Sequence, residues 1–205
     1  SIGKHILYND NLLNITNNKG LIKKKKKIDT DNVIFSDYFD IYVGLVSGKE
    51  EIYKNEDFGN IEVLNGKDKI EKYIYLKKFP CENDDINEYL LQHKKKLIER
   101  KIRKFNEKNW FEWGAPRNIN AINAYMGEKC IYIYNLTRKS NVAFVGEINY
   151  FGGNLIMLRP KNKCNLKNIV AYINSDDFKT NFIFSGRFKI GHRQICNSLL
   201  PTKLL

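Results

Sequence analysis

Short apolar runs, each closed by turn residues, follow one another from residue 33 onward and predict β-strands. The runs are rich in valine, isoleucine, tyrosine and phenylalanine, which favour the half-buried surface of a pleated sheet. Asn65-Gly66 lies between two of these runs, as expected of a hairpin connection. The predicted strands cover residues 33–35, 41–46, 51–53, 61–64, 73–76, 129–134, 142–145 and 155–158.

Residues 84–107 have a helical rather than an alternating pattern. Apolar positions from Ile86 to Phe105 recur at helical spacing, which predicts one amphipathic helix of roughly 20 residues capped by Asp84 or Asp85. Many of the other positions are cationic: Lys94, Lys95, Lys96, Arg100, Lys101, Arg103 and Lys104. The helix either packs by its apolar stripe with a solvated charged back, or follows a DNA backbone with its basic face.

The C-terminal part of the chain predicts shorter helical structure. Residues 166–173 fit a helix with Asn165 as its N-cap, whereas residues 178–184 fit a helix or a strand equally well. Together the patterns predict an α+β chain that is β-rich, with a long basic helix and a smaller C-terminal helical part.

Residues 1–32 are polar and irregular, and we expect them to be a linker or the end of a preceding catalytic domain. Turns are predicted at Asn9, Asn11, Asn14, Asn17, Asn18 and Gly20. Residues 23–27 are five consecutive lysines, which either contact phosphates or form a solvated tail.

Charge points to a polyanionic partner. The 205 residues include 35 Lys and Arg against 23 Asp and Glu, a net charge of +12. Abundant lysine, asparagine and isoleucine also fit a coding bias toward A and T, so composition alone leaves nucleic-acid binding open. No apolar run reaches the roughly 20 residues of a membrane helix and no signal peptide opens the chain, so we expect a cytoplasmic protein without a membrane partner.

Cysteine and histidine are scattered. Cys81, Cys130, Cys164 and Cys196 contain no Cys-x-x-Cys pair, so we expect reduced thiols rather than a zinc site or a disulfide framework. The three histidines are equally dispersed, and no metal site is predicted.

Three segments carry a resemblance when they are taken in order. Residues 42–49 read Tyr-Val-Gly-Leu-Val-Ser-Gly-Lys, and residues 110–117 read Trp-Phe-Glu-Trp-Gly-Ala-Pro-Arg. Residues 173–201 contain Ile-Asn-Ser, a basic run between Gly186 and Arg193, and a closing Asn-Ser-Leu-Leu-Pro. Together they resemble the target-recognition domain of an adenine-specific DNA methyltransferase of the Taq I-like restriction-modification class.

The resemblance covers about residues 33–203 and has a specific order of motifs. The family's Val-Gly-Ile-Val-Thr-Gly motif matches here with Ser47 in place of threonine. A Leu-x-x-Arg helix end and a tryptophan follow, here Leu97–Arg100 and Trp110. Leu200-Pro201 matches the Leu-Pro with which the family's recognition region ends. The resemblance implies that residues 33–205 are a DNA target-recognition domain. It also implies an N-terminal methyltransferase domain of the same polypeptide that precedes Ser1 or was removed.

The chemistry of methyl transfer is not encoded in these residues. An adenine methyltransferase needs a glycine-rich strand-to-helix turn for S-adenosylmethionine and an Asn/Asp-Pro-Pro-aromatic loop for the flipped adenine. Neither occurs, because the four prolines are isolated and Phe151-Gly152-Gly153-Asn154 precedes a predicted strand and is interpreted as a turn. We therefore expect no catalytic, cofactor-binding or metal-binding residues here, and S-adenosylmethionine only in the parent enzyme.

Sequence readout needs side chains that reach base edges, and loops on a rigid sheet usually carry them. The Lys49 loop ranks first because glycines bracket it, although a simple hairpin turn is the alternative. Trp110 and Trp113 are interpreted as core residues. Arg159 is a weaker phosphate candidate. The predicted DNA-binding residues are Lys49, Arg117, Asn118, Arg138, Lys139, Arg187, Lys189, His192 and Arg193.

Two other functions remain open. One is an RNA-binding accessory domain, in which the basic helix and exposed tyrosines stack on single-stranded bases. The other is a nuclease or nuclease-associated DNA-binding domain, in which Glu50, Glu51, Asp57 and Glu62 converge around a metal ion.

Overall fold

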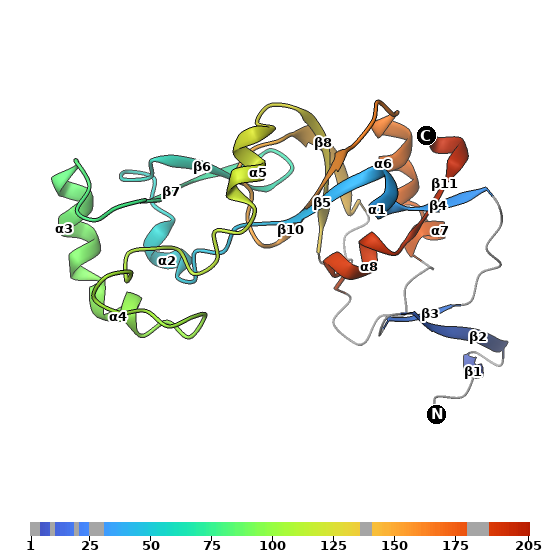
Figure 1. The fold of residues 1–205 in the computed structure, drawn as a ribbon, viewed down its shortest axis with the longest axis horizontal. Helices are drawn as coiled ribbons and strands as arrows, with labels where there is room; N and C mark the ends of the chain where they lie inside the picture. Colours follow the sequence, from blue (N-terminus) through green and yellow to red (C-terminus); the bar gives the residue numbers. More distant parts are fainter. Residues whose placement is uncertain (1–4, 9–10, 19–20, 25–30, 136–140, 180–188) are drawn as a thin grey trace. The chain divides into compact units, whose positions relative to one another are not determined.

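The computed structural model describes residues 5–8, 11–18, 21–24, 31–135, 141–179 and 189–205, with side chains from residue 31 onward (Figure 1). The chain forms two compact units. Unit 1 comprises residues 1–42, 129–146 and 156–205, and unit 2 comprises residues 43–128 and 147–155. Helices and sheets occur in both, so the predicted α+β class is confirmed.

Unit 1 is built on a four-stranded sheet with the strand order β5-β10-β8-β9. The strands are β5 (Phe39–Val43), β8 (Lys129–Tyr134), β9 (Ala143–Glu147) and β10 (Leu155–Pro160). Four consecutive residues of β8, from Cys130 to Ile133, are buried. This continuous burial is expected of an interior strand with both faces covered, and it explains the unbroken apolar run in the sequence.

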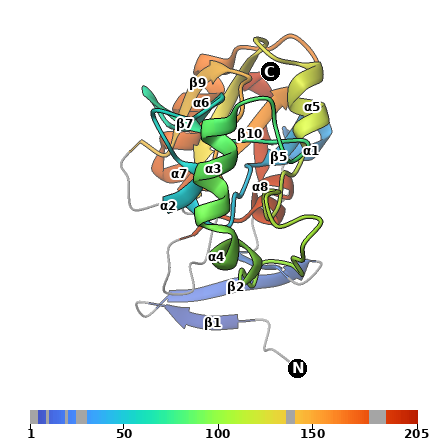
Figure 2. The ribbon, with the colours of Figure 1, turned by 90° about the vertical axis from the view of Figure 1, so that its left-hand side faces the viewer.

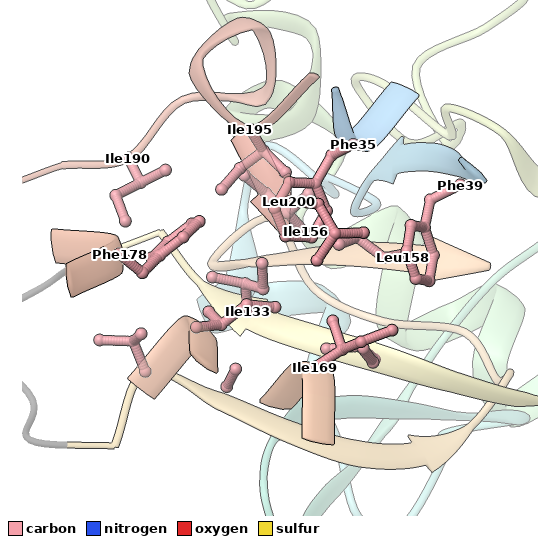
Figure 3. Packing of buried hydrophobic residues seen from close by; sticks show 14 residues of the cluster. Phe35, Phe39, Ile133, Ile156, Leu158, Ile169, Phe178, Ile190, Ile195 and Leu200 are labelled. Atoms are coloured by element: carbon pink, nitrogen blue, oxygen red, sulfur yellow. The ribbon is translucent and has the colours of Figure 1, made fainter. Parts of the chain in front are cut away.

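Short helices supply the rest of the core of unit 1. They are α1 (Phe35–Tyr38), α6 (Leu166–Asn174), α7 (Asp176–Lys179) and α8 (His192–Cys196). Figure 3 shows Phe35, Phe178 and Ile169 from the helices packed around Ile133 and Ile156 of the sheet. Each such side chain contributes about 1.5–3 kcal/mol when it leaves water, so this cluster is the main source of stability in unit 1.

Two strands distant in sequence close unit 1. β4 (Asn32–Ile34) pairs antiparallel with β11 (Leu199–Pro201), with Leu200 opposite Val33. The short 3₁₀ helix η1 (Thr202–Leu204) follows. Leu200 is fully buried, so the Leu-Pro close of the sequence anchors the C-terminal end in the core.

The N-terminal residues contain three strands where turns were predicted. β1 (His5–Tyr8), β2 (Asn11–Asn18) and β3 (Leu21–Lys24) form an antiparallel sheet in that order. The turn prediction is therefore wrong for Asn11, Asn14, Asn17 and Asn18, which all lie in β2. Because β2 pairs with a strand on each side, backbone hydrogen bonding outweighs the low strand propensity of asparagine. Asn9, Gly20 and Lys25–Lys27 lie outside the described residues.

Unit 2 contains a hairpin, four short helices and long irregular connections. β6 (Ile61–Gly66) pairs antiparallel with β7 (Lys69–Tyr73), with a register shift between Leu64 and Gly66. The helices are α2 (Glu50–Tyr53), α3 (Asp84–Gln92), α4 (Lys94–Ile98) and α5 (Ile119–Ala124). None of the helices that the structure describes has the length and apolar character of a membrane span.

The single long basic helix predicted over 84–107 is wrong. Figure 2 shows α3 and α4 as separate coils, and the backbone leaves helical geometry at His93 (φ −103°, ψ 1°). Helix α4 ends at Ile98, and the segment that follows is irregular up to Phe105, which is buried. The N-cap is Asn83, whose side chain accepts a hydrogen bond from the Ile86 amide, rather than Asp84 or Asp85.

Other predictions have mixed outcomes. The strand at 129–134 and the helix after Asn165, whose side chain accepts from the Asn168 amide, are confirmed. The predicted strand at 51–53 is wrong because the Lys49 carbonyl accepts from the amides of both Ile52 and Tyr53, which closes a helical turn. Within 178–184 only the end of α7 is described, and it is helical.

Candidate nucleic-acid interface

Arg100 is the organising residue of unit 2. Its side chain is buried, with the residue 5% exposed, and the guanidinium donates to four main-chain carbonyls. Nε donates to Leu97 (2.7 Å), and Nη1 donates to Ser47 (2.9 Å). Nη2 donates to Trp110 (2.5 Å) and Glu112 (3.0 Å). This arginine therefore does not belong to a solvated basic face, as the long-helix prediction had placed it.

Aromatic rings complete the environment of Arg100. The guanidinium carbon lies 3.7 Å from the centroid of the Phe105 ring and 5.4 Å from that of Tyr53. Such stacking satisfies the face of the cation, while the carbonyls satisfy its edge. Burial lowers the pKa of Arg100, which still remains charged at neutral pH. Burial raises the pKa of Tyr53 to about 12, and its hydroxyl donates to the Phe111 carbonyl (2.9 Å).

The hydrogen bonds of Arg100 join residues 42–49, the Leu97–Arg100 helix end and residues 110–117; the first and last of these are two of the three segments that carry the resemblance. A backbone bridge reinforces the first and third of these. The Val46 amide donates to the Ala115 carbonyl (3.1 Å), and the Ala115 amide donates back to Val46 (2.9 Å). The loop that carries Lys49 and the loop that carries Arg117 are therefore side by side in unit 2.

The Lys49 loop turns at a glycine as predicted. Gly48 has φ +84°, a left-handed conformation that disfavours side chains, and it packs against Ile102 and Arg100. Lys49 then serves as the N-cap residue of α2, so this is a turn into a helix rather than a hairpin turn. Its Nζ lies 3.2 Å from Glu51 Oε1 with the lysine side chain 36% exposed, a weak and displaceable ion pair.

Arg117 and Asn118 lie between the backbone bridge and α5. Arg117 is exposed. Asn118 is the N-cap residue of α5 with φ +59°, and its Nδ2 donates to the Val43 carbonyl (3.0 Å). This amide hydrogen therefore holds the loop to the Val43 main chain, and Arg117 is the more accessible of the two side chains.

A further pair of cations adjoins these loops. Ile102 packs over Gly114 and Gly48, and the exposed residues Lys101 and Lys104 flank it in sequence. Arg103 is partly neutralised, since its Nη2 lies 2.6 Å from a carboxylate oxygen of Glu112. We define the Arg100 surface as the accessible cations on the joined segments or directly after Arg100: Lys49, Lys101, Lys104 and Arg117.

The predicted residues of unit 1 form a separate group. Lys189, His192 and Arg193 are exposed around the start of α8. The His192 ring is held by its Nε2, which lies 2.9 Å from the Ile41 carbonyl oxygen of β5. Lys189 and Arg193 are therefore the better candidates for phosphate contact. Arg138, Lys139 and Arg187 lie outside the described residues.

Two other assignments concern residues outside the predicted DNA-binding set. Arg159 lies 3.2 Å from the Asp40 carboxylate, so its charge is already partly compensated. Trp110 and Trp113 are 3% and 2% exposed, which confirms the core interpretation. The Trp113 indole Nε1 donates to the Ile74 carbonyl (2.8 Å), as a buried tryptophan requires.

Cofactor and metal chemistry can be tested against the residues present. Phe151-Gly152-Gly153-Asn154 is a turn before β10, as predicted. A side chain at Gly152 would meet Asn65 Oδ1 at 1.9 Å, so Asn65 packs directly against this glycine. Within the described ranges no three His, Cys, Asp or Glu residues group to hold a metal. The convergence of Glu50, Glu51, Asp57 and Glu62 required by the nuclease hypothesis is therefore wrong.

Sequence comparison gives one informative similarity. Over 206 aligned residues the chain is 28% identical to the type II methyltransferase M.MjaIV of Methanocaldococcus jannaschii, covering 85% of this chain and 68% of that protein. No protein-family model matches the chain. The chain is therefore similar in sequence to a type II methyltransferase over most of its length.

Structural comparison gives a weaker similarity. The crystal structure of the type IIG restriction endonuclease BpuSI aligns with a TM-score of 0.47 and 12% identity. The alignment covers 85% of this chain and 24% of the endonuclease, so the chain spans about a quarter of that protein.

Proposed function

We propose that this chain recognises double-stranded DNA as the specificity domain of an adenine-specific, S-adenosylmethionine-dependent DNA methyltransferase in a restriction-modification system. The observation that carries the proposal is the joining, through Arg100, of two of the three segments on which the resemblance rests, residues 42–49 and 110–117. The similarity to a type II methyltransferase and the net charge of +12 support it.

The physical roles follow from the placement of the cations. Lys49, Lys101, Lys104 and Arg117 neutralise phosphates, which provides most of the affinity and makes it depend steeply on salt. Arg117 also has the planar donor geometry that reads guanine, where a good bidentate contact contributes about 1–3 kcal/mol of discrimination. Arg100 holds the backbones of the loops in place from the interior of unit 2, so that less backbone ordering is needed on binding.

Methyl transfer itself belongs to another part of the proposed parent enzyme. An N-terminal methyltransferase domain would bind S-adenosylmethionine and receive the flipped adenine. The glycine turn at 151–154 precedes the strand β10, whereas the glycine-rich turn for S-adenosylmethionine precedes a helix, and this supports placing that chemistry outside the present residues.

The first experiment is a duplex-DNA titration of the 205-residue chain, followed by fluorescence anisotropy at two salt concentrations with single-stranded RNA as competitor. We expect salt-sensitive duplex binding that resists the RNA. A preference for the RNA would favour the RNA-binding alternative, and a folded sample that binds no duplex at low salt would contradict the proposal.

Variants locate the interaction. We expect Lys101→Ala combined with Lys104→Ala to reduce the slope of log affinity against log salt by about 1–2, because each lost phosphate contact removes about 0.9. The matched control is Lys163→Ala combined with Lys167→Ala, two exposed lysines of unit 1 next to and within the start of α6. Equal slopes for both variants would place the phosphate contacts elsewhere.

A further inference from the structure

A cleft of about 440 Å³ opens in unit 2 beside α5, and none of its lining residues is among the predicted DNA-binding residues. Its walls come from the start of β6, from the segment after β7, from α5 and from the turn before β10. The volume falls within the range typical of small-molecule sites. The lining residues are Asn60, Ile61, Tyr75, Lys77, Ile119, Asn120, Asn123 and Tyr150.

Two tyrosines and an asparagine organise the polar side of this cleft. The Tyr150 hydroxyl donates to Asn123 Oδ1 (2.7 Å), which fixes the Asn123 amide with Nδ2 as the donor left for a ligand. Tyr75 is held by Asn60, whose amide exchanges hydrogen bonds of 2.7 and 2.8 Å with the Tyr75 main chain. Burial raises the pKa of Tyr75, and the nearby Tyr150 hydroxyl adds to the effect, which places the two phenols in the same environment.

Several polar groups lining the cleft are not engaged by the protein. Among the residues that the structure describes, no hydrogen bond uses the Tyr75 hydroxyl, the Asn120 amide or Asn123 Nδ2. Lys77 is exposed at the same cleft. Donors and acceptors thus line a cleft that also contains aromatic rings and the aliphatic side chains of Ile61 and Ile119.

We propose that this cleft binds a single unstacked nucleotide. A nucleobase is flat and needs an aromatic surface for its face together with amide groups for its edge, and Tyr75, Tyr150, Asn120 and Asn123 supply both. Lys77 supplies the charge for the attached phosphate. The inference rests on the proposed nucleic-acid function and extends it, since a base outside the duplex stack would be held by unit 2.

The test is a nucleotide titration of the full chain, isotopically labelled, with the side-chain amide signals of Asn120 and Asn123 followed by NMR. The probes are the four deoxynucleoside monophosphates and, separately, S-adenosylmethionine. We expect saturable shifts at the cleft with deoxynucleotides. Asn123→Leu should weaken binding about tenfold, the loss expected for one good contact to a base. Tyr150→Phe should weaken it less, because it removes only the group that orients Asn123.

The control is Asn162→Leu, an exposed asparagine of unit 1, with thermal unfolding to verify that each variant is folded. Absence of saturable shifts, shifts unaffected by Asn123→Leu, or tighter binding of S-adenosylmethionine than of any deoxynucleotide would overturn the inference. Duplex DNA is titrated in parallel. Duplex binding without nucleotide binding would overturn the cleft inference and leave the DNA-recognition proposal standing. Cleft-specific nucleotide binding without duplex binding would overturn the DNA-recognition proposal and leave the cleft inference standing.

Discussion

The Arg100 Nη1 donates a 2.9 Å hydrogen bond to the Ser47 carbonyl, across a sequence separation of 53 residues. The Gly114 amide donates to the same carbonyl oxygen (2.9 Å), so a single main-chain acceptor links three segments of unit 2. A lysine cannot replace this arginine, because an ammonium lacks the planar fork that reaches four carbonyl oxygens at once.

We expect Arg100→Lys and Arg100→Ala to destabilise the protein by about 3 kcal/mol or more, because each leaves several buried carbonyls without a donor. Urea unfolding followed by tryptophan fluorescence measures this loss. Arg103→Ala is the matched control: it removes an exposed ion pair with Glu112 and one hydrogen bond to the Trp113 carbonyl, and its cost should be smaller, about 1 kcal/mol. Similar losses for positions 100 and 103 would show that the buried hydrogen bonds are not the source of stability.

Ser47 gives a prediction of the opposite sign. Its hydroxyl oxygen is buried and, among the described residues, has no hydrogen-bond partner. Ser47→Ala removes this unsatisfied group and leaves the carbonyl that Arg100 uses. We expect a stability equal to the wild type or higher by up to about 1 kcal/mol, measured by the same urea titration. A loss of more than about 1 kcal/mol would indicate that the hydroxyl bonds to a buried water.

The sequence predicted most of the interior correctly, because burial leaves a direct pattern in the residues. The run at 129–134 became the buried strand β8, and Trp113 became a core residue. The helical periodicity of residues 84–107 led to a wrong prediction, since the apolar spacing continues past Ile98 although the helix ends there. What ends the helix is a set of carbonyls from 47, 110 and 112 that Arg100 binds, and no local pattern reports such distant partners.

The candidate site could be predicted only in part for the same reason. Loop residues such as Lys49 and Arg117 were predicted to bind DNA because glycine and proline mark their turns. The Asn60–Tyr75–Asn123–Tyr150 cleft could not be identified, because its residues come from four separate segments and none belongs to a motif. The asparagine strand β2 was missed because pairing with two neighbours, rather than propensity, holds it.

The stability that Glu71 gives to unit 2 depends on pH. Its carboxylate accepts from Lys54 Nζ (2.6 Å) and Asn65 Nδ2 (2.6 Å) and lies 3.2 Å from Lys69 Nζ. Partial burial opposes ionisation, but these partners outweigh it and lower the pKa of Glu71 below its ordinary value. A lowered folded-state pKa means that the stabilisation is present above the ordinary carboxyl pKa, about 4.3, and is lost as the pH falls through the lower folded-state value.

We therefore expect Glu71→Gln to be less stable than the wild type at pH 7, with the difference shrinking as the pH falls below about 4. Thermal unfolding across pH 3–7 measures the difference. Glu62→Gln is the control, since Glu62 is an exposed residue of the partner strand. A Glu71→Gln deficit that stays constant down to pH 3 would mean that ionisation of the carboxylate contributes nothing.

The basic residues around the start of α8 should fall into two kinds, those that affect DNA binding and one that affects stability. Lys189 and Arg193 are exposed, whereas the His192 ring is held 2.9 Å from the Ile41 carbonyl. If unit 1 contributes to the DNA interface, Lys189→Ala and Arg193→Ala each lower duplex affinity and reduce the salt slope by about 0.9. Their unfolding midpoints should change little, because exposed substitutions usually cost under about 0.5 kcal/mol.

His192→Ala should show the reverse. Its free energy of unfolding should fall by about 1 kcal/mol while its salt slope stays unchanged, because the ring bonds to a strand rather than to solvent. Anisotropy titrations at several salt concentrations, paired with urea unfolding of each variant, separate the two effects. A reduced slope for His192→Ala would mean that the histidine itself contacts phosphate, whereas unchanged slopes for both Lys189→Ala and Arg193→Ala would remove α8 from the interface. The phosphate contacts would then have to come from the Arg100 surface, where the Lys101 and Lys104 variants measure them independently.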